Sequence, residues 1–359
     1  MSHPVLIGGQ WRAANASGTF QAVDPKTREP LPDQYPISTW ADCDEALSAA
    51  AKAFVELTAA GSAPIAKFLD LYATKIEGRA AELVAAAHAE TGLPVEPRLA
   101  KAELPRTVNQ LRQAAEAVRD GSWVHATIDT KNNIRSMFSG AGPVAVFGPN
   151  NFPFAFNSIA GGDFVAAIAS GCPVIAKGHS SHPTTTRIFG ELAHEAATEA
   201  GLPVGTIQLV YRTGHADGEK LVSDHRISAS GYTGARSAGL KLKAAADKAG
   251  KLFYAELSSV NPLVILPGAL EERSAALVDE YGGSCLMGTG QFCTNPGMVL
   301  LLAGAATETY IGKVVEKFNG SPAGVLLSGG TLDSLHKAVE TLEAAGAELL
   351  TGGDPISGA

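Results

Sequence analysis

A regular alternation of apolar runs and helical segments begins at residue 143 of the chain. Short apolar runs are typical of buried strands, and segments with apolar residues three and four positions apart are typical of helices. The predicted strands are 144–147, 174–176, 207–210, 227–230 and 252–255, and the predicted helices are 158–170, 184–200, 218–223 and 236–249. Strands and helices that alternate in this way predict an α/β fold with a doubly wound parallel sheet.

The first 121 residues have a different pattern. Residues 5–37 predict short strands and turns in a peripheral layer. Helices are then predicted at 42–60, from Pro64 onward, at 79–91 and at 104–119. Asp42 and Glu45 have the spacing of a capping box, and Gly92 and Gly121 are suited to end helices. We therefore expect a layer of helices before the sheet.

Polar and apolar residues roughly alternate between residues 123 and 138, which predicts a hairpin with its turn at 131–133. A hairpin inserted between helical layers has few local partners. We therefore expect it to pair with another subunit.

Composition narrows the class of protein. Of 359 residues, 45% are hydrophobic and 18% are charged, so a sizeable core can form, and the length predicts two domains. The net charge of −8 argues against nucleic acid or an anionic membrane as the main partner. The first residues given, Met1 to Pro4, do not have the basic and apolar pattern of a signal sequence, and no run of roughly 18 apolar residues could span a bilayer. We expect a cytoplasmic protein.

The four cysteines are Cys43, Cys172, Cys285 and Cys293. Their spacing is not that of a metal site, and in a reducing compartment they should be free thiols. Cys293 stands out because it lies among glycines and amides at 288–297, between a helical segment and an apolar run. An exposed turn of this kind is suited to a nucleophile, although single cysteines are more often buried and inert.

Several polar residues follow the predicted strands, at the edge where parallel sheets bind ligands. Asn151 could donate its amide to an oxyanion, Lys177 could meet a ribose or phosphate, and Glu256, if partly buried, could act as a general base. The glycine-rich passage 231–239 could receive a phosphate at a helix start. Alternatively, these residues are a turn asparagine, a salt-bridged lysine, a solvated carboxylate and a tight turn.

Five segments together resemble the aldehyde dehydrogenase family over nearly the whole chain. They are FGPNNFP (147–153), AKGHS (176–180), GYTGARSAG (231–239), AELSSVNP (255–262) and GTGQFCTNPG (288–297). Within that family, ELSSVNP, GQFCTNP and KGHSSHP look most like the α-ketoglutaric semialdehyde (2,5-dioxovalerate) dehydrogenases.

The resemblance implies catalytic roles for three residues. Cys293 would attack the aldehyde carbonyl, and the Asn151 side chain and the Cys293 backbone N–H would hold the oxyanion. Glu256 would activate the water that hydrolyses the thioester. This division of roles is chemically sound, because a thioester needs a base-generated nucleophile.

The resemblance also implies a dinucleotide cofactor. The cofactor-binding positions would be Phe147, Pro149, Lys177, Ser180, Gly234, Ala235 and Leu257. Relatives that prefer NAD have a glutamate where this chain has Ser180. A carboxylate would repel a 2′-phosphate, whereas a hydroxyl can donate to it, so we expect NADP to be preferred, with NAD also possible. The alternative is that Ser180 tolerates both cofactors.

For the substrate, the helix 104–119 would line the entrance tunnel. Arg106 could then grip a carboxylate in bidentate fashion, as an α-keto acid semialdehyde requires. The apolar tunnel wall would be formed by Phe152, Phe156 and Phe292. Arg98 is a weaker candidate for the carboxylate, and Arg106 as a solvated helix residue is the alternative.

The resemblance implies a dinucleotide-binding domain at 1–121 and 142–257, an oligomerisation hairpin at 122–141, and a catalytic domain at 258–359. The catalytic domain should be incomplete, because family members continue beyond Gly358 and Ala359. A homodimer or homotetramer is expected. The alternatives to α-ketoglutaric semialdehyde oxidation are a dehydrogenase of a fatty, aromatic or succinic semialdehyde substrate and a nucleotide-binding protein without turnover.

Overall fold

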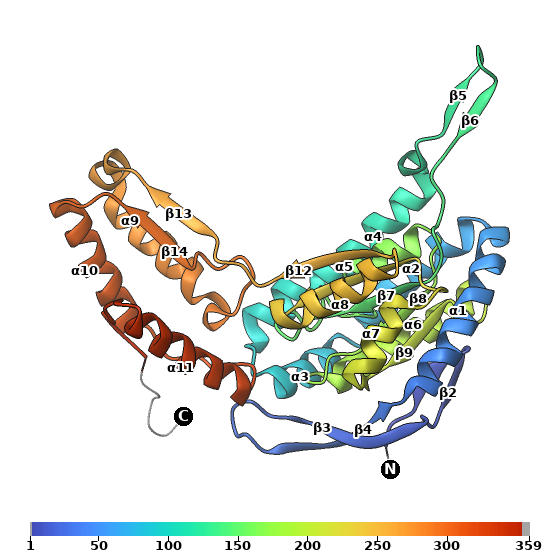
Figure 1. Ribbon diagram of the computed structural model, residues 1–359, viewed down its shortest axis with the longest axis horizontal. Coiled ribbons are helices and arrows are strands. Elements are labelled where there is room, and N and C mark those ends of the chain that lie inside the picture. Colours follow the sequence, from blue (N-terminus) through green and yellow to red (C-terminus); the bar gives the residue numbers. More distant parts are fainter. Residues whose placement is uncertain (1, 354–359) are drawn as a thin grey trace. The chain divides into compact units, whose positions relative to one another are not determined.

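The computed structural model describes residues 2–353, and the chain divides into two compact units (Figure 1). Unit 1 is Met1–Asp24 and Glu29–Leu257, and unit 2 is Pro25–Arg28 and Ser258–Ala359. Both units have an α/β architecture, which confirms the fold class expected from the sequence.

Unit 1 is built on a seven-stranded sheet with the order β12-β11-β7-β8-β9-β1-β2. The run from β12 to β9 is parallel, and β1 and β2 join it antiparallel. The strands are β1 (Val5–Ile7), β2 (Gln10–Arg12), β7 (Val144–Phe147), β8 (Val174–Lys177), β9 (Ile207–Val210), β11 (Ala229–Gly234) and β12 (Leu252–Leu257). Three strands thus have almost the predicted bounds, while β11 and β12 extend further toward their carboxyl ends than the apolar pattern indicates.

Two groups of helices cover the sheet of unit 1. The helices are α1 (Trp40–Ala60), α2 (Ala63–Gly78), α3 (Ala80–Thr91), η1 (Val95–Glu103), α4 (Leu104–Asp120), η2 (Ser122–Val124), α5 (Gly162–Ala169), α6 (Pro183–Ala200), α7 (His215–Ser223) and α8 (Arg236–Lys248). One group has α2 packed against α4, α5 and α6, and the other has α7 packed against α1 and α8. The chain runs from β7 to β9 in one direction and then returns to β11 and β12, so right-handed crossovers put α5 and α6 on the face opposite α7 and α8. The sheet is therefore doubly wound.

Strand β1 belongs to the core rather than to a peripheral layer, which corrects the expectation for residues 5–7. The β1 side chains are at most 1% exposed, because the strand pairs with β9 on one side and β2 on the other. Only β3 (Ala16–Val23) and β4 (Pro30–Ser38), which form a smaller sheet with β10 (Arg212–Thr213), lie outside the main sheet.

The capping box at Asp42 is also wrong. Helix α1 begins at Trp40, so Asp42 lies inside its first turn, with Thr39 at the N-cap. The buried Asp42 carboxylate accepts hydrogen bonds from the Arg12 guanidinium and from the backbone N–H and side chain of Asn15. The carboxylate that the local pattern assigns to a helix cap therefore binds residues 12 and 15 of an earlier segment instead.

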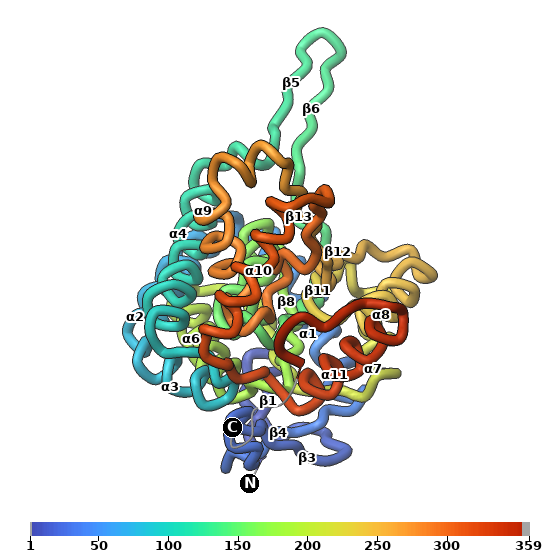
Figure 2. The backbone as a smooth tube through the Cα atoms, turned by 90° about the vertical axis from the view of Figure 1, so that its left-hand side faces the viewer, coloured from blue at the N-terminus to red at the C-terminus, as the bar shows by residue number. Residues whose placement is uncertain are grey.

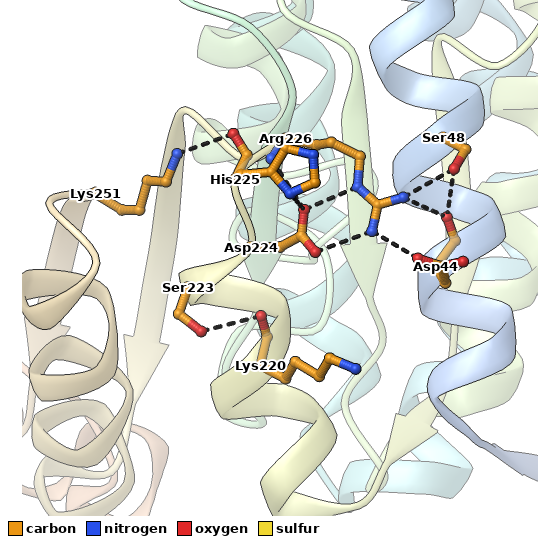
Figure 3. A network of polar contacts seen from close by, with 8 residues as sticks. All are labelled: Asp44, Ser48, Lys220, Ser223, Asp224, His225, Arg226 and Lys251. Carbon is orange, nitrogen blue, oxygen red and sulfur yellow. Dashed lines mark hydrogen bonds and ion pairs between the residues drawn. The ribbon is translucent and has the colours of Figure 1, made fainter.

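An arginine network holds α1 to the connection between α7 and β11 (Figure 3). Arg226 Nε and Nη2 donate to Asp224, and the same guanidinium reaches Asp44 and Ser48 on α1. Lys251 Nζ donates to the His225 carbonyl at 3.0 Å. Arg226 lowers the pKa of Asp224, so this surface cluster stays charged and joins segments that are far apart in the sequence.

The predicted hairpin is present as β5 (Thr127–Asp129) and β6 (Ile134–Ser136), paired antiparallel. Figures 1 and 2 show that it stands out beyond the end of α4. Asp129 accepts from the backbone N–H groups of Lys131 and Asn132, which fixes the turn.

Up to residue 353, unit 2 has a parallel strand pair, three α-helices and one short 3₁₀ helix. Its elements are β13 (Pro262–Ile265), α9 (Pro267–Leu286), η3 (Met287–Gly290), β14 (Met298–Leu301), α10 (Ala305–Asn319) and α11 (Gly329–Ala344). Ile265, Leu270, Val278 and Tyr310 form its core. The helix before Cys293 and the strand after it are therefore where the sequence places them.

Candidate active site

The loop after β7 carries Asn151 and is tied down at several points. Residues 151–161 form turns, and α5 begins only at Gly162, so the predicted helix start at 158 is wrong. A Cβ at Gly161 would lie 2.5 Å from the Phe156 Cα, which shows how tightly the loop folds on itself. His182 Nε2 donates to the Pro149 carbonyl at 2.8 Å, and Asn157 Nδ2 donates to the Pro153 carbonyl at 2.9 Å.

Lys177 ends β8, beside this loop in the sheet, because it pairs with Phe147 of β7. Among the described residues, no carboxylate lies within ion-pair distance of its ammonium group. Burial, and secondly the charge of Arg212, lower the pKa of Lys177 to about 8. A partly buried cation without an acidic partner is suited to an anionic or hydroxyl-bearing ligand.

Arg212 is a residue that the sequence reasoning missed. It follows β9 by two positions, and its guanidinium carbon lies 5.7 Å from the centre of the Phe20 ring. The same rule that selected Lys177, a polar residue at the carboxyl end of a parallel strand, would have found it. Ser180 lies half-buried in the turn after Lys177. This edge of the sheet therefore presents two cations and a hydroxyl.

Gly234 ends β11 and Ala235 precedes α8, so both lie at the carboxyl edge next to Phe147 of β7. A Cβ at Gly239, in the first turns of α8, would lie 2.3 Å from the Leu257 side chain. The glycine therefore lets α8 approach β12 closely. The glycine-rich passage thus serves packing as well as the turn into a helix N-terminus.

Glu256 lies in β12, opposite Thr233 of β11, rather than after the strand. Its side chain is exposed, so the partial burial expected from the sequence is not found. The apolar run before it does not bury it, because β12 is an edge strand of the sheet.

In unit 2, Cys293 occupies an exposed turn. Its carbonyl accepts hydrogen bonds from Ser259 Oγ and from Asn261 Nδ2, the latter at 2.7 Å. Asn295 Nδ2 donates to the carbonyls of Cys285 and Gly290, at 2.8 and 3.2 Å. The turn is therefore built by side-chain amides.

Ser259 and Asn261 were missed as supports of this turn. Both belong to the ELSSVNP segment, in which the sequence analysis assigned a catalytic role to Glu256 alone. Phe292 packs on Gly288, where a Cβ would lie 2.7 Å from its ring. Gly288 also has a φ of 58°, so a side chain there would both clash with the Phe292 ring and adopt an unfavourable backbone conformation.

Three of the predicted substrate residues lie together in unit 1. The rings of Phe152 and Phe156 meet edge to face at 5.1 Å, and the exposed Arg106 guanidinium lies 5.0 Å from the Phe156 ring centre. Among residues 2–353, no carboxylate pairs with Arg106. Arg98 is different, since it is paired with the buried Glu103 and its side chain is only 12% exposed. Its role as a carboxylate binder is therefore corrected.

Other kinds of site find no support in the part of the chain that the structure describes. No three His, Cys, Asp or Glu side chains are grouped closely enough to hold a metal ion. No helix of residues 2–353 is both long and apolar enough to cross a bilayer.

An open groove of about 830 Å³ between α7 and α8 is lined by residues that include Lys220, Lys241 and Lys248.

The sequence matches the family model described as "Aldehyde dehydrogenase family" over residues 11–359. It is 39% identical over 342 residues to α-ketoglutaric semialdehyde dehydrogenase 2 of Azospirillum brasilense, covering 92% of this chain and 64% of that protein. It is 35% identical over 348 residues to the α-ketoglutaric semialdehyde dehydrogenase of Acinetobacter baylyi, covering 94% and 65%. The chain thus spans about two thirds of the length of these relatives.

Solved structures share the fold. An NAD-dependent benzaldehyde dehydrogenase from Corynebacterium glutamicum superposes with a TM-score of 0.84 at 25% identity, covering 99% of this chain and 77% of that one. An aldehyde dehydrogenase from Pseudomonas syringae, solved with NAD⁺ and octanal, superposes with a TM-score of 0.86 at 21% identity, covering 99% and 72%.

Proposed function

Because the chain belongs to the aldehyde dehydrogenase family, we propose that it oxidises an aldehyde to a carboxylic acid with NADP or NAD as hydride acceptor. The observation that carries the proposal is the carboxyl edge of the unit 1 sheet. That edge combines the anchored Asn151 loop, a partly buried cation without an acidic partner at Lys177, and the turn at Gly234. These features suit a dinucleotide beside an aldehyde.

In the proposed reaction, the Cys293 thiolate attacks the aldehyde carbon to form a tetrahedral thiohemiacetal. The Asn151 amide and the Cys293 backbone N–H donate to the oxyanion. NADP or NAD, when bound, supplies the hydride acceptor that converts the adduct to a thioester. Glu256 then takes a proton from water, the resulting hydroxide attacks the thioester carbon, and the acid leaves as the thiolate is restored. The exposure of Glu256 and of Cys293 gives both groups access to water.

The residues present suit the cofactor. We assign Lys177 and Ser180 to the ribose, and Gly234, Ala235, Phe147, Pro149 and Leu257 to the remaining contacts. Ser180 and the second cation at Arg212 favour NADP, because a 2′-phosphate would meet positive charge and a hydroxyl. Ser180→Glu should lower kcat/KM with NADP by about 10- to 100-fold and raise it with NAD, since a carboxylate repels the phosphate. Ser181→Glu, one residue on, is the control and should leave the preference unchanged.

For the substrate we propose α-ketoglutaric semialdehyde, which would be oxidised to α-ketoglutarate. The identity to two dehydrogenases of that name supports this choice. The exposed, unpaired Arg106 beside Phe152 and Phe156 supports it independently, because a guanidinium over an apolar surface suits a short chain that ends in a carboxylate. Phe292 would complete the apolar wall. A dehydrogenase of fatty, aromatic or succinic semialdehyde substrates is the alternative.

The test is the initial rate of NADPH formation with α-ketoglutaric semialdehyde, hexanal, benzaldehyde and succinic semialdehyde. Cys293→Ala should abolish turnover. Arg106→Ala should lower kcat/KM for the α-keto acid by about 10- to 100-fold and leave hexanal unchanged, as expected for one charged hydrogen-bond pair. Arg112→Ala, on the same helix but paired with Glu77, is the control.

Two outcomes would contradict parts of this proposal. A preference for hexanal or benzaldehyde that survives Arg106→Ala would reject the substrate but keep the reaction. Binding of NADP without oxidation of any aldehyde would reject the reaction and favour a nucleotide-binding protein without turnover.

We further propose that the protein assembles as a homodimer or homotetramer through the β5–β6 hairpin. Ile128 and Ile134 on its strands are 68% and 56% exposed, and Met137 and Phe138 just beyond it are 67% and 63% exposed. Apolar side chains on a two-stranded ribbon favour pairing with another chain.

A further inference from the structure

A buried ion pair lies beneath the loop that carries Asn151. Glu103, at the end of η1, has no exposed side-chain surface, and its partner Arg98 is 12% exposed. Glu103 Oε1 accepts from the backbone N–H groups of Phe154 at 2.8 Å and Ala155 at 2.9 Å. Its other oxygen is paired with Arg98 Nη1. One carboxylate therefore serves two loop amides and a guanidinium.

Arg98 continues the network to Asn151 itself. Its Nη2 donates to the Asn151 carbonyl at 3.0 Å, and its guanidinium carbon lies 4.4 Å from the centre of the Phe152 ring. The planar guanidinium makes these contacts together, which a lysine ammonium could not do. The pair thus contacts four of the five residues from 151 to 155.

The energetics argue against a role in stability alone. Burial raises the pKa of Glu103, although Arg98 and the two amides oppose the shift. Buried ion pairs seldom stabilise a fold more than apolar residues of the same size would, but removing one partner is costly. Such a pair is therefore a means of fixing one geometry, and the geometry fixed here is that of the Asn151 backbone.

We propose that Arg98 and Glu103 are positioning residues, which hold the Asn151 backbone so that its side-chain amide meets the oxygen of the bound aldehyde. The inference rests on the proposed function, because that function assigns Asn151 to the oxyanion. A displacement of about 1 Å in a donor of this kind can cost about 100-fold in rate, so the anchor matters for turnover even though it touches no substrate.

The first variants are Glu103→Gln and Arg98→Lys in the full chain. The glutamine carbonyl of the first variant can still accept from the Phe154 and Ala155 amides, but its NH₂ group would face the Arg98 donors. The lysine of the second variant keeps the charge but cannot reach Glu103 and the Asn151 carbonyl together. We expect each variant to lower kcat by about 10- to 100-fold, with the KM for the aldehyde and the Kd for NADP nearly unchanged.

The matched control is Asp42→Asn. Asp42 is also a buried carboxylate in unit 1 that pairs with an arginine and accepts from a backbone N–H, but it lies on α1 and serves Arg12 and Asn15. The Asp42→Asn variant should lower Tm as much as Glu103→Gln does, while its kcat stays unchanged.

A double-mutant cycle tests whether the pair acts through Asn151. Asn151→Ala should lower kcat by about 100- to 1,000-fold, and Glu103→Gln should then have no further effect on kcat in that background. Independent, additive losses would overturn the proposal, as would single variants that lose no more kcat than Asp42→Asn.

Hydrogen exchange separates this inference from the proposed function. Glu103→Gln and Arg98→Lys should speed exchange at the Phe154 and Ala155 amides, whereas Asp42→Asn should not. If the unsubstituted protein binds NADP but oxidises no aldehyde, the proposed function and the positioning role are both rejected, and the exchange data then show only a loop anchor. If the unsubstituted protein is active and the variants keep its kcat, the positioning role alone is rejected.

Discussion

Glu90 of α3 is a carboxyl group enclosed in unit 1, and it contacts the first residues of α6. It accepts from the backbone N–H groups of Thr184 and Thr185, at 2.6 and 2.9 Å, and from Thr185 Oγ1 at 2.7 Å. Even with these donors, burial raises the pKa of Glu90 to about 7. The folded protein therefore holds this proton at pH values where the unfolded chain has released it.

The first prediction concerns the pH dependence of stability. Because the pKa of Glu90 is higher in the folded state, its contribution is fully present below about pH 4.5 and is lost as pH rises toward 7, by roughly 3 kcal/mol. The free energy of unfolding, measured by denaturant titration at pH 5 and pH 8, should therefore fall more in the unsubstituted protein than in Glu90→Gln. Equal falls in both proteins would contradict it.

Gly231 gives the second prediction. A Cβ at this position in β11 would lie 2.7 Å from Asp163 Oδ2 and 3.0 Å from its Cγ, so the glycine makes room for a carboxylate of α5. Gly231→Ala should cost about 1–3 kcal/mol of unfolding free energy, because the carboxylate must move. The same substitution in an Asp163→Ala background should cost clearly less. An equal cost in both backgrounds would mean that strand geometry, rather than Asp163, requires the glycine.

Single residues also show where sequence reasoning ends. The positions of Asn151, Lys177 and Cys293 follow from their places after strands or in a turn, because such places are set by local pattern. The partners do not follow. Asp42 pairs with Arg12 instead of capping α1, and Arg98 pairs with Glu103 instead of lying free for a substrate carboxylate. Local periodicity cannot predict either pairing.

At the scale of elements, apolar periodicity finds most strands and helices of the parallel sheet. It fails at ends that tertiary contacts decide. β11 and β12 extend to Gly234 and Leu257 because the two strands pair along six residues each, although the extensions include the polar Glu256 and the small Gly234. Likewise α5 starts late, because Asn157 accepts from the backbone N–H of Ile159 with its side chain and from that of Gly161 with its carbonyl, which holds this segment in turns.

The third prediction concerns the hairpin. Replacing both Ile128 and Ile134 by serine should reduce the oligomer to a smaller species in sedimentation velocity, because each side chain would otherwise bury its apolar surface against another chain. Tm measured at low protein concentration should change little, since neither side chain is buried within the chain. Lys131→Ser in the turn is the control. An unchanged sedimentation coefficient in the double variant would place the interface elsewhere.

At the scale of the whole molecule, the predicted catalytic residues are divided between the two units. Asn151, Glu256 and all the predicted cofactor residues belong to unit 1, whereas Cys293 and Phe292 belong to unit 2. The length of the chain predicted two domains, and the family resemblance, rather than any local pattern, implied a catalytic domain at 258–359. Unit 2 has a core of its own around Tyr310.

The fourth prediction follows from this division. NADP should slow hydrogen exchange in unit 1 at the carboxyl ends of β7, β8 and β11, where binding covers backbone amides. The amino ends of the same strands, such as residues 172–174 of β8 and 227–229 of β11, are an internal control and should be unaffected. Protection confined to the amino ends would place the dinucleotide on the opposite edge of the sheet.

The lowered pKa of Lys177 also determines its reactivity. With a pKa of about 8, a much larger fraction of the side chains carries a free amine near neutral pH than for an ordinary lysine. A free amine attacks acylating reagents, whereas an ammonium ion does not. A bound phosphate would return the proton to Lys177 and quench that nucleophilicity. The rate at which an acylating reagent labels Lys177 should therefore show whether an anion is bound at the carboxyl edge of the sheet.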